Sequence, residues 1–301
     1  MPIRHVVVVL AVLLLAGCGS DAAAPPPTAP ADGTIPVVAS TNVYGSIADA
    51  VGGTHVSVSS LVSDPAADPH SFESTPADAA AVAGATLVIH NGGGYDDWMS
   101  ELVAGAGGTP TVIDVSELTG QAAGGEFNEH VWYSLPTVRQ LAGRIAGDLA
   151  AADPAHAAEF TANAEAFAGR VDELQARAQA IGAAHPGARV MVTEPVPGYL
   201  IQTAGLVDVT PPEFSEAVEE DTDPSAAVVQ QTLDALATQQ VRALIVNAQT
   251  VTPTTEQVRQ AAQTDGVPIV EVTETLPAGT TDYTSWMGAQ IDALAAALQK
   301  G

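Results

Sequence analysis

Cysteine is almost absent from this sequence, because Cys18 is the only one among its 301 residues. A single cysteine cannot form an intramolecular disulfide, so the folded part of the chain must be stable without one. Basic residues are also scarce, with 9 Lys and Arg against 35 Asp and Glu and a formal net charge of -26. Such a charge repels phosphate backbones and anionic lipids, which argues against nucleic-acid binding, and it attracts cations. The acidity also fits a simple role in solubility or in adaptation to salt.

Long hydrophobic runs are missing as well, apart from a short one near the start. Arg4 precedes the apolar run Val6 to Leu15, which is too short to cross a bilayer but is typical of a signal peptide. The sequence Leu15-Ala16-Gly17-Cys18 follows it and resembles a bacterial lipobox. We therefore expect residues 1–17 to be a signal peptide and Cys18 to carry a lipid.

Residues 18–34 contain Pro, Ala and Gly and no large apolar side chain. This composition, which lacks any helical or strand periodicity, is typical of a flexible tether. A tether behind a lipidated cysteine would hold a folded body close to the membrane. The expected location is the extracytoplasmic face of the cell membrane, through a lipid anchor.

The sequence from Ile35 onward alternates short strand-like runs with helix-like stretches. We expect strands at 37–39, 56–61, 87–89, 111–115, 189–192, 244–246 and 269–272. We expect helices near 43–51, 76–83, 95–103, 225–238, 255–264 and 283–298. This rhythm predicts an α/β fold in which helices flank parallel sheets. The chain length favours two such lobes, at 35–152 and 187–301.

The segment 153–186 between the lobes has the most regular pattern in the chain. Asp153 can cap a helix that has Pro154 at its first position. Apolar side chains then recur at alternating spacings of four and three, at Phe160, Ala164, Phe167, Val171, Leu174, Ala178 and Ile181. A helix that continued to Ala184 would be roughly 46 Å long, enough to join both lobes as a rigid spine. A coiled-coil oligomer would also fit the spacing, but the alanines in the seam favour a spine within a monomer.

Two histidines are placed to act as metal ligands. His70, in ADPHSFESTPAD, follows an Asp-Pro turn, and Thr75 and Asp78 after it form a capping-box pattern. His130, in NEHVWYSLPTV, also stands just before a helix. Neutral imidazole is a common metal ligand, but two histidines 60 residues apart are a weak signal on their own. His90, at the end of a strand, fits a satisfied polar residue better than a ligand.

Two glutamates follow strands of the second lobe. Glu194 lies in VMVTEPVPGYL and Glu274 in PIVEVTETLPAG. Ligands of α/β proteins gather at such strand ends. Two imidazoles and two carboxylates around a divalent cation sum to zero charge, which lowers the cost of burying them. Four protein ligands leave little room for a substrate, so the site would hold a metal rather than use it in catalysis.

At these residues the chain resembles a known family. The motifs DPHSFESTPAD, NEHVWYSLPTV, VTEPVPGYL and VTETLP occur in this order, with the long helix between the second and the third. They are similar to those of the metal-binding solute-binding lipoproteins of zinc and manganese ABC importers, the cluster A-I family. The resemblance covers about Ile35 to Leu298. It implies two α/β lobes joined by a rigid helix, one Zn²⁺ or Mn²⁺ ion between them as the transported ligand, and delivery to a membrane permease. It assigns the metal ligands as His70, His130, Glu194 and Glu274.

Several positions depart from the pattern of that family. Glu129 stands where the family usually has a proline before its second histidine. The third ligand is histidine in many zinc members and glutamate in manganese or iron members, so Glu194 favours manganese. The fourth is usually aspartate, and Glu274 is one methylene longer, which leaves Glu271 as an alternative. The histidine-rich loop of some zinc members is absent. Because zinc outcompetes manganese at most sites of this type, we expect zinc as the ion bound in vitro, with manganese possible in the cell.

Two other classes of function remain as alternatives. A secreted mononuclear metallohydrolase would need an open coordination position and a nearby general base, and the sequence contains no His-Glu-x-x-His motif. A surface adhesin or scaffold of the same fold would bind a protein instead of a metal. The sequence therefore favours a binding protein that is not an enzyme.

Overall fold

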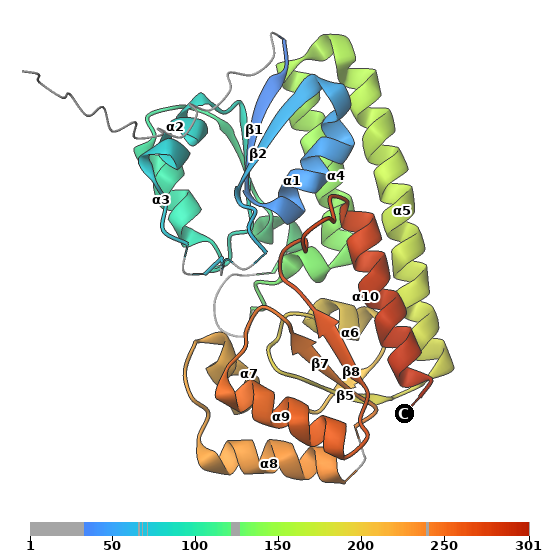
Figure 1. The fold of residues 1–301 in the computed structure, drawn as a ribbon. Coiled ribbons are helices and arrows are strands. Elements are labelled where there is room, and N and C mark those ends of the chain that lie inside the picture. Colours follow the sequence, from blue (N-terminus) through green and yellow to red (C-terminus); the bar gives the residue numbers. More distant parts are fainter. Residues whose placement is uncertain are drawn as a thin grey trace, which may run out of the picture.

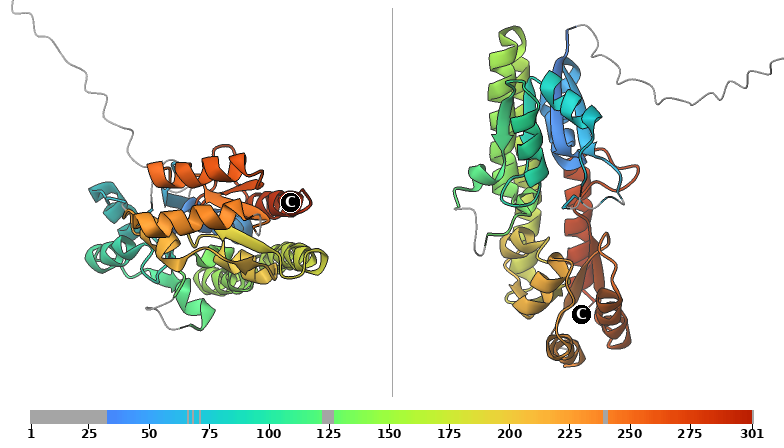
Figure 2. Two further views of the ribbon diagram at one scale, coloured as in Figure 1. Left: turned by 90° about the horizontal axis from the view of Figure 1, so that it is seen from below. Right: turned by 90° about the vertical axis from the view of Figure 1, so that its left-hand side faces the viewer.

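The computed structural model describes residues 33–300, except 66, 68, 71, 122–126, 239 and 240. Figure 1 shows two α/β lobes stacked end to end beside one long helix, and the side view in Figure 2 shows the same long axis. The expected α/β architecture with two lobes is confirmed. The expected signal peptide, Cys18 and nearly all of the expected tether lie outside the described residues.

The N-terminal lobe is built on a four-stranded parallel sheet in the order β2-β1-β3-β4. Its strands are β1 (Ile35–Thr41), β2 (Val56–Val62), β3 (Leu87–His90) and β4 (Thr111–Asp114). Helices α2 (Pro76–Gly84) and α3 (Asp97–Gly105) cover one face, while α1 (Asn42–Gly52) and α4 (Leu135–Ala152) cover the other. Short 3-10 turns are η1 (Gly53–His55), η2 (Ser116–Thr119) and η3 (Val131–Tyr133). The central strand β3 is buried throughout, as expected for a parallel sheet with helices on both faces.

The C-terminal lobe repeats this plan with the strand order β6-β5-β7-β8. Its strands are β5 (Arg189–Val192), β6 (Val207–Asp208), β7 (Ala243–Asn247) and β8 (Ile269–Val272). Helices α7 (Pro212–Glu219), α8 (Ala226–Ala237) and α9 (Pro253–Thr264) pack on one face, and α6 (Gly198–Thr203) and α10 (Tyr283–Leu298) on the other. The sequence patterns did not predict β6, α6 or α7, which are short elements.

The connecting segment begins with the 3-10 turn η4 (Pro154–His156), and α5 (Ala157–Ala184) follows it. Asp153 caps η4 by accepting a hydrogen bond from the backbone N–H of Ala155, so the expected α-helix starts about one turn late. All seven apolar positions of the expected seam are buried. At 28 residues α5 is about 42 Å long, and it packs on α1 and α4 of one lobe and on α6 and α10 of the other. The apolar face of α5 therefore packs within the chain, as expected for a spine and not for a coiled-coil oligomer.

The two lobes share one hydrophobic core. A single cluster of buried residues extends from the N-terminal sheet through α4, α5 and α10 into the C-terminal sheet. Phe167 of α5 lies against Tyr283 of α10 with ring centroids 6.0 Å apart, and the Tyr283 hydroxyl donates to the carbonyl of Trp132 at 2.7 Å. The relative position of the lobes is thus fixed by packing. In the described part of the chain, no helix combines the length and apolar character that a membrane span needs.

Candidate metal centre

The carboxyl ends of the strands in both sheets face the junction between the lobes. The segment after β2 carries His70, and the segment just before η3 carries His130. The segments after β5 and β8 carry Glu194 and Glu274. Parallel strands end at one edge of their sheet, so the fold brings the four predicted residues to the same region from positions far apart in the sequence.

His70, His130 and Glu274 lie close together. Potential ligand atoms of these three residues all lie within 4.8 Å of one another. The Nε2 atom of His70 lies 3.7 Å from Oε2 of Glu274, and the two imidazole rings have centroids 6.3 Å apart. Two nitrogen donors from one lobe and a carboxylate from the other thus converge, a donor set that suits a divalent transition metal.

The ring of His130 is buried and has a fixed orientation. Its backbone N–H and its Nδ1 atom both contact Oδ1 of Asn128, at 3.0 and 2.9 Å. Because an amide oxygen can only accept, Nδ1 carries the proton and Nε2 presents its lone pair. Among the described residues, that buried Nε2 has no hydrogen-bond partner. Burial, followed by the nearby His70, holds the pKa of His130 well below its usual value, which keeps the ring neutral and able to bind a metal.

Glu274 is only 5% exposed and is held by groups from both lobes. Its Oε2 accepts from the hydroxyl of Tyr95 at 3.0 Å, and its Oε1 accepts from Nδ2 of Asn247 at 2.8 Å. Its backbone N–H donates to Oε1 of Gln249. These bonds fix the carboxylate at the junction before any cation arrives.

Glu194 is buried close to the same centre. Burial is the main reason that the pKa of Glu194 rises to about 8, and the charges of Glu219 and Glu274 add to it. Hydrogen bonds with Thr250 and Asn247 act in the opposite direction. Among the described residues, its Oε2 has no hydrogen-bond partner and Glu194 falls outside the groups with converging ligand atoms. Its role as a ligand therefore stays a prediction.

Glu219, the last residue of α7, also reaches this centre, and the sequence patterns did not point to it. Its Oε1 lies 3.3 Å from Nε2 of His70 and 3.4 Å from Nε2 of His130. Burial is the largest cause of the rise in the pKa of Glu219 to about 7, and contact with His70 opposes it. Glu129, His130 and Glu219 form a second group with converging ligand atoms. The only sequence signal was the acidic run that starts at Glu219, which looks like an ordinary solvated helix end.

Two other residues considered from the sequence have other partners. Glu271 is exposed on β8 and forms an ion pair with Arg259, so it does not replace Glu274 at this centre. His90 is 4% exposed, and its Nδ1 lies 3.4 Å from Oδ1 of Asp96. The contact with Asp96 agrees with the expectation of a satisfied polar residue only in part, because among the described residues this buried Nδ1 has no hydrogen-bond partner.

Comparison with known proteins gives a family match over most of the chain. The family model described as ZnuA, zinc-uptake complex component A, periplasmic, matches residues 37–297. The manganese-binding lipoprotein MntA of Bacillus subtilis is 29% identical over 166 residues, which are 53% of this chain and 53% of that protein. The iron ABC transporter substrate-binding lipoprotein MtsA of Streptococcus pyogenes is 28% identical over 182 residues, 56% of this chain and 57% of that protein. The chain thus matches about half the length of these relatives.

Solved structures share the fold. The periplasmic zinc-binding protein TroA of Treponema pallidum superposes with a TM-score of 0.75 at 23% identity, over 88% of this chain and 99% of that one. FpvC of Pseudomonas aeruginosa in complex with Mn²⁺ gives a TM-score of 0.72 at 23% identity, over 88% and 98% of the two chains. At this level of identity the comparison supports the architecture of two lobes and a long helix.

Proposed function

The chain belongs to the family of periplasmic zinc-uptake component A proteins, and on this premise we propose that it captures one divalent transition-metal ion between its lobes and delivers it to an ABC permease. One observation carries the proposal. Ligand atoms of His70 and His130 from one lobe and of Glu274 from the other lie within 4.8 Å of one another. The surrounding side chains orient these donors in advance, which favours binding over ligand exchange during catalysis.

We propose Glu194 as the fourth ligand. Its carboxylate is buried beside Asn247 and Thr250, which restrain it, and one of its oxygens has no hydrogen-bond partner among the described residues. With His70, His130 and Glu274 it forms a neutral set around a divalent cation. Glu219 contacts the two imidazole nitrogens that would bind the cation. Entry of a cation therefore has to displace the Glu219 oxygen or recruit it.

The donors and general metal chemistry support a proposal for the cargo. Relatives are named as manganese-binding and as iron-transporting lipoproteins, and a structural neighbour is named as zinc-binding. Carboxylate oxygens suit Mn²⁺, but zinc binds more tightly than manganese at nearly every site of mixed nitrogen and oxygen donors. We propose that Zn²⁺ is the tighter ligand of the purified protein and that Mn²⁺ is the alternative cargo in the cell.

The location is part of the same proposal. Leu15-Ala16-Gly17-Cys18 resembles a lipobox, and the relatives are named as lipoproteins. We propose that Cys18 carries a lipid and that the tether 18–34 lets the two lobes reach a permease from the outer face of the cell membrane. The lobes are proposed to act as a monomer without a catalytic step.

The test is metal analysis of the purified protein together with competition titrations of Zn²⁺ and Mn²⁺. Combined His70→Ala and His130→Ala substitutions should remove binding at this centre. Glu274→Gln should weaken Zn²⁺ binding at least a hundredfold, whereas the matched change Glu271→Gln on the exposed face of β8 should have no effect. Unchanged affinity after the histidine substitutions, or equal effects of the two Glu→Gln changes, would refute the assignment.

A further inference from the structure

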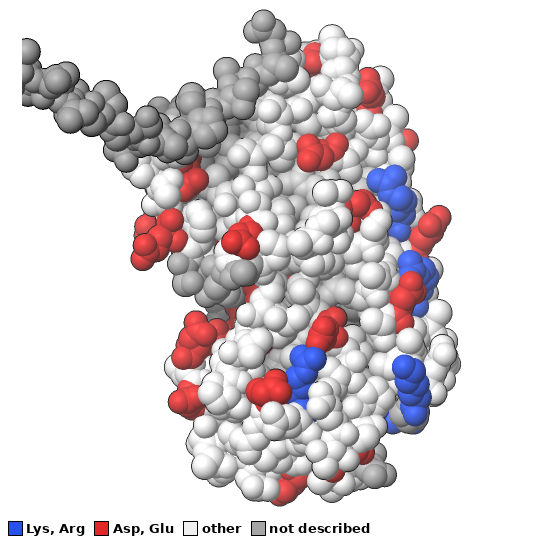
Figure 3. All heavy atoms as spheres, in the orientation of Figure 1, with Lys and Arg blue, Asp and Glu red and all other residues white. Residues whose placement is uncertain are grey.

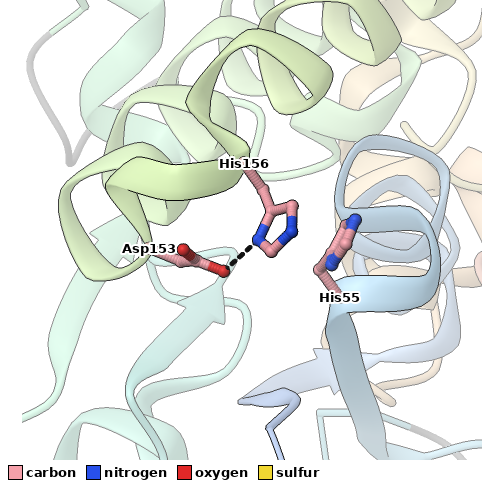
Figure 4. Close-up of side chains that lie close together, drawn as sticks. All are labelled: His55, Asp153 and His156. Carbon is pink, nitrogen blue, oxygen red and sulfur yellow. Dashed lines mark hydrogen bonds and ion pairs between the residues drawn. The ribbon is translucent and has the colours of Figure 1, made fainter.

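A second cluster of metal-binding side chains lies at the opposite end of the N-terminal lobe. Potential ligand atoms of His55, Asp153 and His156 all lie within 4.8 Å of one another. His55 is the last residue of η1, whereas Asp153 caps η4 and His156 ends it. Figure 4 shows the two imidazoles facing each other across the junction of these segments, with Asp153 beside His156. Residues about a hundred positions apart in the sequence are thus brought together.

The cluster is separate from the candidate metal centre. His55 immediately precedes β2, whose first residue pairs with the first residue of β1, so it lies at the amino-terminal edge of the sheet. His70 follows the carboxyl end of the same strand. Seven strand residues separate the two edges, a distance of roughly 20 Å. The second cluster therefore cannot share a cation with the first.

Each imidazole of the cluster lies against a carboxylate. Nδ1 of His156 contacts Oδ2 of Asp153 at 2.6 Å, and Nε2 of His55 contacts Oε2 of Glu159 at 3.0 Å. The two imidazole rings are stacked, with centroids 3.8 Å apart and an interplanar angle of 24°. Each ring thus has a carboxylate partner that can orient it or bind the metal directly. Two imidazoles and two carboxylates together balance the charge of a divalent cation.

The sequence around the cluster contains few basic residues that could pair with its carboxylates in place of the imidazoles. No Lys or Arg occurs between Arg4 and Arg139, or between Arg144 and Arg170. On the face drawn in Figure 3, Lys and Arg side chains lie along the connecting helix and over the lower lobe. Asp153 forms an ion pair with His156, and Glu159 forms one with His55. All four side chains remain partly exposed, so a cation can reach them from solvent.

We propose that His55, Asp153 and His156, with Glu159 beside them, bind a second divalent transition-metal cation of the kind that prefers imidazole, such as Zn²⁺. The cation links the turn before β2 to the start of the connecting segment. His55 also packs edge-on against Phe160, the first buried residue of the spine, with ring centroids 5.7 Å apart. Binding there therefore stabilises the attachment of α5 to the N-terminal lobe. The site does not depend on the transport proposal, because it shares no residue with the candidate metal centre.

Zinc titration against a chromophoric chelator tests the site. In a chain with His70→Ala and His130→Ala, one equivalent of Zn²⁺ should still bind. Adding His156→Gln should weaken this binding at least tenfold. The matched control is His185→Gln, at the other end of α5, which should leave it unchanged. The proposal is overturned if the double variant binds no Zn²⁺, or if the two His→Gln changes have equal effects.

A second test uses the wild-type chain and so does not require that the double variant folds. Metal analysis after dialysis against micromolar Zn²⁺ should give one equivalent more for the wild-type chain than for His156→Gln. Zinc should also raise the melting temperature of the wild-type chain more than that of the variant. Equal zinc contents in the two proteins would refute the second site. Loss of the first centre alone would instead lower both contents equally, so the two proposals fail in different ways.

Discussion

Asn128 holds the ring of His130 and at the same time bonds to the other lobe. Its Oδ1 accepts from Nδ1 of His130 at 2.9 Å, and its Nδ2 donates to the carbonyl of Pro195 at 2.8 Å. The hydroxyl of Tyr199 in turn donates to the backbone carbonyl of Asn128 at 2.8 Å. Pro195 directly follows Glu194. The side-chain amide of Asn128 therefore connects His130, a proposed ligand from the N-terminal lobe, to the segment of the C-terminal lobe that carries Glu194.

Replacement of Asn128 by alanine should weaken Zn²⁺ binding about 10- to 100-fold. Without the Asn128 oxygen the tautomer and orientation of His130 are no longer fixed, and partners of this kind typically have an effect of this size. Competition titration measures it. Asn163→Ala is the matched control, because the Asn163 side chain donates to the carbonyl of Val51 far from this centre, and both variants carry His156→Gln so that the second cluster does not contribute. An Asn128→Ala affinity equal to that of wild type would show that the amide does not position the ligand.

Conservative substitutions can show whether Glu194 or Glu219 is the fourth metal ligand. Glu194→Gln should weaken Zn²⁺ binding at least a hundredfold, because it removes the charge of the restrained, buried carboxylate that we propose as the fourth ligand. Glu219→Gln should weaken binding clearly less than Glu194→Gln does, because in the proposed site Glu219 contacts the imidazoles without being one of the four ligands. Titration of both variants measures this, with Glu220→Gln on the exposed neighbour as the control. The reverse order of effects would make Glu219 the ligand in place of Glu194.

Much of the fold could be predicted from the sequence, because it depends on local periodicity. The seven apolar residues of the spine repeat with helical spacing, and all of them are buried in α5. Thr75 and Asp78 form the expected capping box at the start of α2, because that motif needs only residues three positions apart. The start of α5 was less predictable. Asp153 and Pro154 suit the first turn of either helix type, and the chain forms a 3-10 turn there.

The candidate site was harder to predict, because its geometry depends on contacts between distant segments. His70, His130 and Glu274 follow recognisable motifs next to strands and helices, and these three converge. Glu219 has no such motif, and only the packing of α7 brings it to the imidazoles. The cluster of His55 and His156 is similar, since each histidine alone looks like a surface residue in a turn. Their proximity follows from the way α5 packs against the N-terminal lobe.

The shared core predicts that damage to the spine destabilises the whole molecule. Phe167→Ala should lower the free energy of unfolding by about 3–5 kcal/mol, because it removes a fully buried ring. Phe167 lies in the cluster that extends into both sheets, so the urea unfolding curve should stay a single transition at a lower midpoint. Glu165→Ala, on the exposed side of the same helix, is the control. A variant that unfolds in two steps, with one lobe unaffected, would show that the lobes fold independently.

The raised carboxyl pKa values predict that the metal-free protein becomes less stable as the pH rises from about 6.5 to 8. Burial raises the pKa of Glu194 from 4.5 to about 8 and that of Glu219 from 4.5 to about 7. In this range the unfolded chain has already lost both protons, whereas the folded chain releases that of Glu219 near pH 7 and that of Glu194 near pH 8, so the free energy of unfolding falls with pH. The pKa of His130 is lowered, and the opposite effect of that group on stability is confined to pH values below about 6.5.

The size of this effect, and its removal by a cation, make it measurable. One carboxyl that keeps its proton over this range corresponds to a loss of about 2 kcal/mol between pH 6.5 and 8. Urea unfolding in the presence of a chelator should show the fall, and Glu194→Gln should remove most of it, because an amide does not titrate. Saturating Zn²⁺ should reverse the trend, since the cation replaces the protons that the buried carboxyls would otherwise hold. A metal-free protein whose stability does not fall from pH 6.5 to 8 would mean that these carboxyls are already ionised in the folded state.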